Sequence, residues 1–281
     1  MATEGLMNTE EQNLLDLAMT SVKKSAEVIL QVYQSGDFQV EAKSDHSPLT
    51  IADRDSHNII ASMLASTGLP LLSEEGKSIE HKARMSWPKF WLIDPLDGTK
   101  EFLKRNGDFT VNIALIDNGF PVLGVIGIPV TGEIYFAVKG SGAYKIDATS
   151  TVVKLKARTR VSVGDRGLRV VSSRSHLDPR TERFIAGLKE PIAVNRGSSL
   201  KFLLLAEGEA DVYPRFAPTM EWDTAAAQII LEETGISVIN TEDGMPLRYN
   251  KPDLYNPFFL AVPGQPHLVG DWLKKSRTLR D

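Results

Sequence analysis

The chain has 281 residues, is 42% hydrophobic and 24% charged like an ordinary soluble globular protein, and contains no cysteine, which excludes disulfides, thiolate metal sites and a cysteine nucleophile. Its net charge of −4, without a dense Lys/Arg block, argues against a nucleic-acid partner. The start of the chain lacks the basic residues of a signal peptide and no apolar run could span a bilayer, so we expect a cytoplasmic protein and leave peripheral membrane association open.

The first part of the chain is expected to be helical. Apolar side chains recur at helical spacing over residues 9–30, and Thr9 with Gln12 has the spacing of a capping box. After a polar loop, Thr50 is the expected N-cap of a second helix, whose first turn contains Asp53.

A short apolar strand then leads to the most informative stretch, residues 91–102. Phe90 to Ile93 should form a strand that ends at Ile93 or Asp94, because Pro95 has no N–H and cannot continue a central strand. Asp94 and Asp97 would then lie in a loop at the carboxyl end of a strand, where open α/β sheets place their ligands. A preceding strand at Leu71-Leu72 runs into Ser73-Glu74-Glu75.

The next segment alternates with the period of strands. Residues 110–116, 122–128 and 133–138 are expected strands, and Asn118-Gly119 and Thr131-Gly132 are turn signals between them. This pattern predicts an antiparallel meander.

Beyond residue 155 the pattern changes again. The basic, weakly apolar segment 157–166 suggests a connection between two domains, 1–155 and 156–281. The alternation of strands and helices that follows predicts an α/β second half. The expected strands are 168–172, 192–195, 210–213, 237–239 and 258–262, and the expected helices are 179–188 with Asp178 as cap, 198–207, 223–234 and 265–275.

Acidic residues lie at several predicted strand ends and helix starts, namely Asp53, Glu74, the pair Asp94 and Asp97, and Asp223. Taken singly, Asp53 and Asp223 can be plain N-caps and Glu74 a solvated turn residue. Gathered about 4 Å apart, carboxylates would repel by about 4 kcal/mol per pair at an effective dielectric constant of about 20, so a cluster requires protons or cations. Oxygen ligands without Cys or clustered His favour Mg²⁺ or Mn²⁺ over Zn²⁺. Two such ions can hold the attacking and leaving oxygens of a phosphate ester, and the helix-start amides after Gly98 suit a phosphate.

These residues resemble the signatures of a known family. Asp94-Pro95-Leu96-Asp97-Gly98-Thr99 is similar to the Asp-Pro-x-Asp-Gly-Thr signature of the Mg²⁺-dependent, lithium-sensitive phosphatases of the inositol monophosphatase superfamily. Trp222-Asp223 resembles the second signature, and Ser73-Glu74-Glu75 resembles a Gly-Glu-Glu segment, with Ser73 in place of the frequent Gly. The resemblance covers nearly the whole chain. It implies an α/β protein built as the layered αβαβα sandwich of the inositol monophosphatase and fructose-1,6-bisphosphatase type, with an α+β N-terminal half.

Within the superfamily, the sequence looks like the CysQ-type 3′(2′),5′-bisphosphate nucleotidases. Lys100-Glu101-Phe102 stands where inositol phosphatases usually have Thr-Asn-Phe, and residues 172–176, 197–201 and 221–226 also resemble this branch. The resemblance implies hydrolysis of 3′-phosphoadenosine 5′-phosphate to AMP and phosphate by metal-activated water. A small nucleotide bisphosphate is therefore the expected partner, and the sequence leaves monomer and homodimer open.

The same resemblance implies a set of metal ligands. Glu74, Asp94 and the Leu96 carbonyl would hold one Mg²⁺ ion. Asp94, Asp97 and Asp223 would hold a second, with Asp94 bridging the two. A third, weaker ion near Glu74 would make two or three Mg²⁺ ions per site.

The implied catalytic pair is Asp53 and Thr99, which would orient and deprotonate the attacking water. The amides of Gly98 and Thr99 would hold the scissile phosphate. The remaining substrate contacts implied by the resemblance are Ser175, His176, Gly197, Ser198, Lys201 and Asp223. Simpler roles stay open for His176 as a helix-start residue and for Lys201 as a solvated one, and Arg196 could bind phosphate or face solvent.

Other functions remain to be weighed. An inositol-monophosphatase-like or broad sugar phosphatase would use the same chemistry, and a metal-dependent phosphometabolite sensor would keep the pocket without turnover. The presence of Asp53 and Thr99 argues against the sensor. A haloacid-dehalogenase phosphatase requires a nucleophilic Asp two residues before the second Asp, and Pro95 occupies that position.

Overall fold

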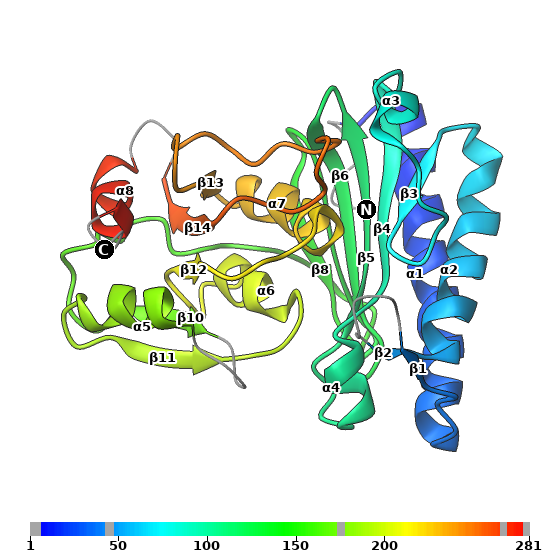
Figure 1. Ribbon diagram of the computed structural model, residues 1–281, viewed down its shortest axis with the longest axis horizontal. Coiled ribbons are helices and arrows are strands. Elements are labelled where there is room, and N and C mark those ends of the chain that lie inside the picture. Colours follow the sequence, from blue (N-terminus) through cyan, green and yellow to red (C-terminus); the bar gives the residue numbers. More distant parts are fainter. Residues whose placement is uncertain (1–6, 43–47, 173–177, 265–268, 278–281) are drawn as a thin grey trace.

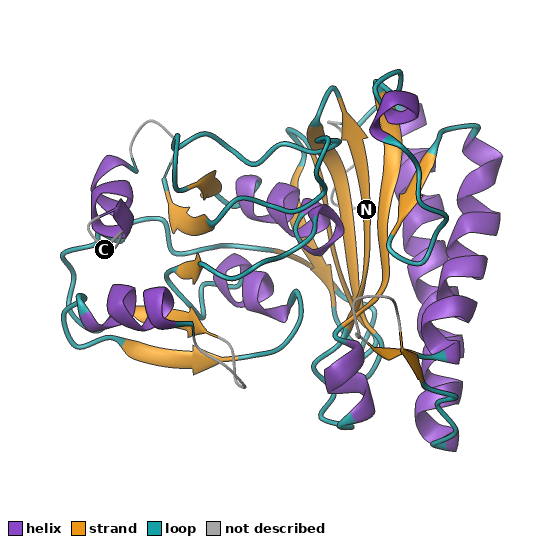
Figure 2. Cartoon of the chain, in the orientation of Figure 1, coloured by secondary structure: helices purple, strands orange, loops and turns teal. Residues whose placement is uncertain are grey.

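The structure is a computed structural model that describes residues 7–42, 48–172, 178–264 and 269–277 (Figures 1 and 2). Ser175 and His176, and the first residues of the helix predicted at 265–275, lie outside the described residues. Across the described ranges, no helix combines the length and the apolar character needed to cross a membrane.

The elements stack in five layers, from the right to the left of Figure 1. A helix pair covers one face of a seven-stranded sheet, and two further helices cover its other face. Beyond them lie two small sheets, followed by the helices α5 (Pro179–Ala186) and α8 (Gly270–Arg277). Figure 2 shows this alternation of helix and strand layers. This is the αβαβα sandwich that the sequence predicts.

The first layer consists of α1 (Thr9–Ser35) and α2 (Ile51–Leu64), which pack along each other. The N-cap of α1 is Asn8, whose side chain forms a capping box with Glu11, so the predicted Thr9–Gln12 box is wrong by one residue. Asn8 has the extended backbone that an N-cap requires, whereas Thr9 is already helical. Thr50 caps α2 as predicted.

The second layer is a sheet in the order β3-β4-β5-β6-β7-β8-β9, in which only β3 and β4 pair in parallel. The predicted meander is confirmed and continues through β8 and β9, which the sequence pattern missed because they are short and partly polar. The strands are β3 (Leu71–Ser73), β4 (Lys89–Asp97), β5 (Thr110–Asp117), β6 (Phe120–Ile128), β7 (Glu133–Val138), β8 (Gly142–Ile146) and β9 (Val152–Lys154).

Strand β4 extends past Pro95, so the predicted end at Ile93 or Asp94 is wrong. Its pairing with β5 is regular as far as Asp94, then shifts, and resumes with Asp97 opposite Thr110. A bulge is one of the few places in a sheet where proline is tolerated, because the extra residues there make no ladder hydrogen bond. The strand therefore survives its proline by bulging at Pro95-Leu96.

Two glycines of β6 allow helices to approach the sheet from opposite sides. A Cβ at Gly124 would lie 2.5 Å from the Ala226 carbonyl oxygen in α7, and one at Gly127 would lie 2.2 Å from the Val22 side chain in α1. Because strand residues alternate between faces, positions three apart face opposite helices. The sheet is thus buried tightly on both faces.

The C-terminal half alternates strands and helices as predicted, but its sheets are mixed. β10 and β11 pair in parallel, whereas β12 and β13 both pair antiparallel with β14. The elements are β10 (Arg169–Ser172), α5 (Pro179–Ala186), β11 (Ile192–Asn195), α6 (Leu200–Ala206), β12 (Tyr213–Arg215), α7 (Ala225–Glu232), β13 (Ile236–Asn240), β14 (Phe259–Pro263) and α8 (Gly270–Arg277).

Several predicted boundaries in this half shift by two or three residues. β12 begins at Tyr213 rather than at residue 210, and α6 begins at Leu200 rather than at Ser198. Asp223 lies in a single 3₁₀ turn, η2 (Glu221–Asp223), and α7 begins only at Ala225. Short connecting elements complete the chain: β1 (Glu41–Ala42), β2 (Pro48–Leu49), η1 (Ala65–Thr67), α3 (His81–Arg84) and α4 (Thr99–Leu103).

The apolar core does not stop at residue 155. One buried cluster joins Phe90 and Ile126 of the large sheet to Ile230 of α7 and Phe259 of β14. Separate clusters fill the space under α1 and α2 and the outermost layers of the C-terminal half. The two halves of the chain therefore share one apolar core.

Candidate active site

The bulge in β4 is held from below by α2. The hydroxyl of Ser56, fully buried in α2, donates a hydrogen bond to the Pro95 carbonyl at 2.6 Å. The Leu96 N–H donates to Asp94 Oδ1 at 3.1 Å, which fixes the carboxylate against its own turn. The loop that carries the two aspartates thus has a defined shape.

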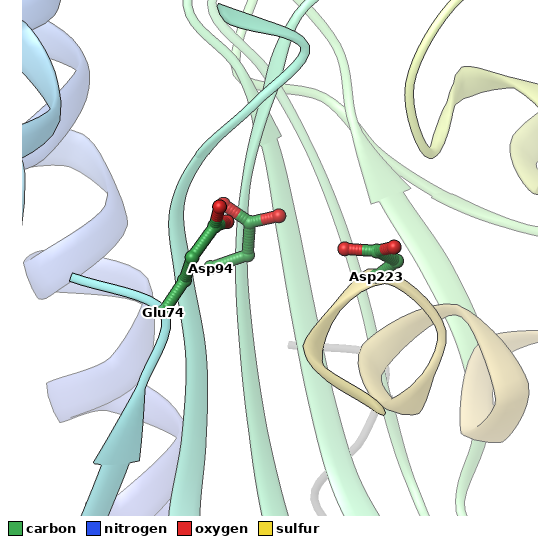
Figure 3. A group of neighbouring side chains, drawn as sticks. All are labelled: Glu74, Asp94 and Asp223. Carbon is green, nitrogen blue, oxygen red and sulfur yellow. The ribbon is translucent and has the colours of Figure 1, made fainter. Parts of the chain in front are cut away.

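Three acidic side chains meet at this bulge. One carboxylate oxygen each from Glu74, Asp94 and Asp223 lies within 4.8 Å of the others. Figure 3 shows Glu74, just after β3, beside Asp94 on β4, with Asp223 facing them from η2. Glu74 is placed by its N–H, which donates to the Ile93 carbonyl at 3.1 Å and so continues the β3–β4 pairing by one residue. Glu74 is therefore more than a solvated turn residue, because its carboxylate belongs to the acidic cluster.

Burial and mutual repulsion make the charged forms of these carboxylates unfavourable. Burial raises the pKa of Asp94 well above its usual value, and the neighbouring carboxylates of Glu74, Asp97 and Asp223 raise it further. Burial, followed by the charge of Asp97, likewise raises the pKa of Asp223. Three oxygens converging in this way are the donor set that a hard divalent cation prefers, since the cation would neutralise their repulsion.

The plain N-cap interpretation of Asp223 is wrong, because Met220 and Thr224 are the N-caps of η2 and α7, and Asp223 is the last residue of η2. Its Oδ2 accepts the Met220 N–H at 2.8 Å and so closes the η2 turn, while its carboxylate also joins the acidic cluster. Asp97 lies beside the cluster and contributes to the electrostatics of Asp94 and Asp223, but it is not among the three converging residues. One oxygen of Asp97 is occupied by the Ser199 hydroxyl at 2.7 Å.

Asp53 and Thr99 are in direct contact. The Thr99 hydroxyl donates to Asp53 Oδ1 at 3.1 Å. Asp53 Oδ2 accepts the Thr50 N–H at 2.7 Å and the Thr50 hydroxyl at 2.6 Å. The capping role of Asp53 is therefore real, yet it uses one oxygen and leaves the other to hold Thr99.

A pocket of about 420 Å³ opens next to the acidic cluster. Its floor includes Asp97, Gly98 and Asp223, and its walls come from both halves of the chain. Five basic residues line it: Lys100, Lys104, Arg196, Lys201 and Arg215. A cavity lined by five basic residues next to an acidic cluster suits a ligand with more than one phosphate.

The loop of residues 197–199 covers the β4–α4 turn. Gly98 has φ +98°, and a Cβ there would lie 2.9 Å from the Asp108 carbonyl oxygen, so only glycine fits. The Gly197 N–H donates to Asp108 Oδ2 at 2.9 Å, and the Ser198 hydroxyl donates to the Asp97 carbonyl at 3.0 Å. The predicted residues Gly98, Gly197 and Ser198 therefore lie together at one wall of the pocket.

Of the five basic residues that line the pocket, the sequence points only to Lys201 and Arg196. The Lys201 ammonium lies 6.0 Å from the centre of the Tyr213 ring, and Arg196 lies 3.6 Å from Asp108 while half-exposed at the pocket wall. Lys100, Lys104 and Arg215 were not predicted, because isolated basic residues are common on surfaces and no spacing distinguishes them. Their convergence is visible only in the fold.

The fold and the site together define the chain as an αβαβα protein of the inositol monophosphatase type. The model of the Inositol monophosphatase family matches residues 10–266, and the chain belongs to this family. It is 41% identical to the 3′(2′),5′-bisphosphate nucleotidase CysQ of Escherichia coli K12, over 88% of this chain and 98% of that protein. The corresponding protein of Haemophilus influenzae is 34% identical over 92% of this chain and 96% of its own length.

Solved structures agree with this assignment. The crystal structure of CysQ from Bacteroides thetaiotaomicron superposes with a TM-score of 0.80 at 45% identity, covering 92% of this chain and all of that one. The suhB protein of Bartonella henselae, at 22% identity and a TM-score of 0.74, covers 96% of this chain and 99% of its own length and shares the fold.

Proposed function

We propose that this protein is a Mg²⁺-dependent phosphatase that hydrolyses 3′-phosphoadenosine 5′-phosphate to AMP and phosphate. The observation that carries the proposal is the pocket, in which a partly buried acidic cluster adjoins five basic side chains. The acidic end suits a metal-bound scissile phosphate, and the basic wall suits a second phosphate. The similarity to CysQ nucleotidases over most of the chain supports the same substrate class.

The residues present fit a divalent cation. Glu74, Asp94 and Asp223 offer converging oxygens, and Asp97 lies close enough to act on the charge of Asp94. We propose Asp97 and the Leu96 carbonyl as further ligands in a set of two or three ions. Bound Mg²⁺ would lower the pKa of a water ligand and neutralise charge that develops on the phosphate. The requirement for a cation is also expected from the electrostatics, because the buried carboxylates repel one another.

The chain's own residues would handle the proton of the attacking water. Because Thr99 donates its hydroxyl proton to Asp53, its oxygen is oriented to accept a proton from water in the pocket. As Thr99 accepts this proton, its own hydroxyl proton would pass to Asp53 Oδ1, so that Thr99 stays neutral and Asp53 becomes protonated. In-line attack of the water oxygen on phosphorus would form one P–O bond and break the bond to the ribose O3′. The departing O3′ would take a proton from solvent and become the 3′-hydroxyl, and Asp53 would return its proton to solvent.

The pocket wall would orient the substrate. The N–H groups at the start of α4, after Gly98, would hold the scissile phosphate, and Ser198 would close over it from the facing loop. Lys201 would hold the second phosphate from the far side. This division of roles would make the site dependent on both the 1–155 and the 156–281 segments, which we propose as the two domains.

One assay tests this function against its closest alternatives. Phosphate release is measured with Mg²⁺, with and without lithium, from 3′-phosphoadenosine 5′-phosphate, inositol 1-phosphate and fructose 1,6-bisphosphate. We expect the first substrate to have the highest kcat/KM and lithium to inhibit. Higher kcat/KM with inositol 1-phosphate would establish an inositol phosphatase instead, and binding without turnover of any substrate would establish a sensor.

A further inference from the structure

A buried polar network lies beneath Asp97, and the proposed reaction does not use it. Asn112, in the middle of β5, donates from Nδ2 to the Ser199 hydroxyl oxygen at 2.8 Å. The Ser199 hydroxyl donates in turn to Asp97 Oδ2 at 2.7 Å, and a second contact from Asn112 Nδ2 reaches the same oxygen at 3.4 Å. The network joins a strand of the first half to a loop of the second.

The orientation of Asn112 is set by a third residue. The Thr110 hydroxyl lies 2.8 Å from the Ser198 hydroxyl and donates to Asn112 Oδ1 at 3.1 Å, and the amide nitrogen points toward Ser199 and Asp97. Thr110, Asn112 and Ser199 are each 2% exposed or less. Buried polar groups of this kind stay in place because every alternative arrangement leaves a donor or acceptor unsatisfied.

The register of the sheet explains how Asn112 reaches Asp97. Asn112 pairs with Asp94 across the β4–β5 ladder, and Asp97 returns to the ladder opposite Thr110 after the bulge. Thr110 and Asn112 therefore face the same side of the sheet, directly beneath the bulged loop. Two polar residues at this spacing in an otherwise apolar strand face the acidic site rather than solvent.

We propose that Asn112 and Ser199 are positioning residues that orient Asp97 for cation binding. They occupy Oδ2, and among the described residues no hydrogen bond reaches Oδ1, which can therefore point toward a cation. Outer partners of this kind hold a ligating carboxylate in one rotamer, and their loss weakens metal affinity about 10- to 100-fold. The inference rests on the proposed Mg²⁺ site. It adds that Ser199, which belongs to the other half of the chain, increases the affinity of this site for Mg²⁺.

A purely structural role would give a different result. If the network served only to join the two halves, its loss would lower the stability of the metal-free protein and leave the affinity for Mg²⁺ unchanged. If it positions Asp97, the affinity for Mg²⁺ falls and the stability changes no more than after loss of any buried hydroxyl. The Mg²⁺ affinity can be measured without substrate, so the result does not depend on the identity of the substrate.

The test compares Ser199→Ala with two related variants. Ser199→Thr keeps the hydroxyl and is the conservative rescue. Ser21→Ala is the matched control, because Ser21 is equally buried, donates to the Leu17 carbonyl at 2.8 Å and lies in α1. Titration calorimetry measures Mg²⁺ binding to the full-length, substrate-free protein, and thermal unfolding in EDTA measures its metal-free stability.

We expect Ser199→Ala to weaken Mg²⁺ binding about 10-fold or more, Ser199→Thr to recover most of this loss, and Ser21→Ala to leave the affinity unchanged. Asn112→Ala should weaken binding similarly, and the double variant should lose less than the product of the two single losses, because both act through Asp97. Asn112→Ala also serves if Ser199→Ala does not fold.

Unchanged Mg²⁺ affinity in Ser199→Ala, or in Asn112→Ala in its place, would overturn the inference. The proposed function would survive this result if the wild-type protein still released phosphate from 3′-phosphoadenosine 5′-phosphate. Conversely, weakened Mg²⁺ binding in these variants would support the positioning role even if the preferred substrate proved to be another phosphate monoester. The two proposals can therefore fail separately.

Discussion

Asp94 and Asp223 lie with carboxylate oxygens within 4.8 Å of each other, although one belongs to the bulge of β4 and the other to the turn before α7. The two residues bring the large sheet and the C-terminal half together beside the basic pocket, which Asp223 also lines. Like charges at this distance repel each other. A cation would convert the repulsion into a bond between them.

Replacement of Asp94 should separate activity from stability. Asp94→Asn removes a proposed ligand, and we expect kcat/KM to fall by more than about 100-fold, since loss of an outer partner alone costs 10- to 100-fold. The same change removes a buried charge, so the metal-free protein at pH 8 should become more stable by about 1 kcal/mol or more. Phosphate release and urea unfolding in EDTA measure the two effects. Asp271→Asn, in an exposed position of α8, is the control; if Asp94→Asn retained near-normal activity at limiting Mg²⁺, the ligand assignment would be wrong.

The stability of the metal-free protein should depend on pH with an unusual sign. The pKa of Asp94 is raised well above its ordinary value and that of Asp223 to about 8, so the folded state holds these protons more tightly than the unfolded state. Above the unfolded pKa of about 4, the unfolded state releases protons first, and stability falls as the pH rises toward 8. Unfolding in EDTA between pH 5 and 8 should show this decline.

Two additions to that measurement identify its cause. Saturating Mg²⁺ should flatten the decline, because the cation replaces the protons, and the Asp94→Asn, Asp223→Asn double variant should lose most of it without any metal. Burial also raises the pKa values of Glu221 and Glu232, so an undiminished decline in the double variant would assign the effect to such groups instead.

Thr99 should affect the chemical step more than metal binding. Thr99→Val keeps the shape of the side chain but removes the hydroxyl that contacts Asp53. We expect kcat to fall by about 10²- to 10⁴-fold, the usual contribution of a proton-transfer group, with little change in the Mg²⁺ concentration for half-maximal rate. Thr99→Ser should restore most of the rate. A lower Mg²⁺ affinity in Thr99→Val with unaltered kcat at saturation would instead make Thr99 part of the metal site.

Lys201 should discriminate between substrates with one and two phosphates. Lys201→Ala removes a cation from the pocket wall, and we expect KM for 3′-phosphoadenosine 5′-phosphate to rise about 10-fold, as for loss of a charged hydrogen bond of about 1.5 kcal/mol. KM for 3′-AMP, which lacks the second phosphate, should change little. Lys274→Ala, in an exposed part of α8, controls for overall charge. Equal losses on both substrates would remove Lys201 from the second-phosphate site.

The element types followed from local sequence patterns in most of the chain. The Asn118-Gly119 and Thr131-Gly132 turns divide the meander as predicted, and Thr50 and Asp178 cap their helices, because these signals act within a few residues. The errors occurred where tertiary pairing overrode a local rule. Pro95 should end a strand, but continued pairing of Asp97 with Thr110 retains it as a bulge.

The sequence by itself determined the chemistry of the site: carboxylates without cysteine ligands, a glycine at the turn and a paired Asp and Thr, in an order that resembles one family. Only the tertiary structure decided which side chains share the site. It brings Asp223 to Glu74 and Asp94, gathers five basic residues along one pocket, and connects Asn112 and Ser199 beneath Asp97. The physical reason is that residue type and local spacing are encoded within a few positions, whereas contacts between distant segments depend on the packing of the layers and the register of their strands.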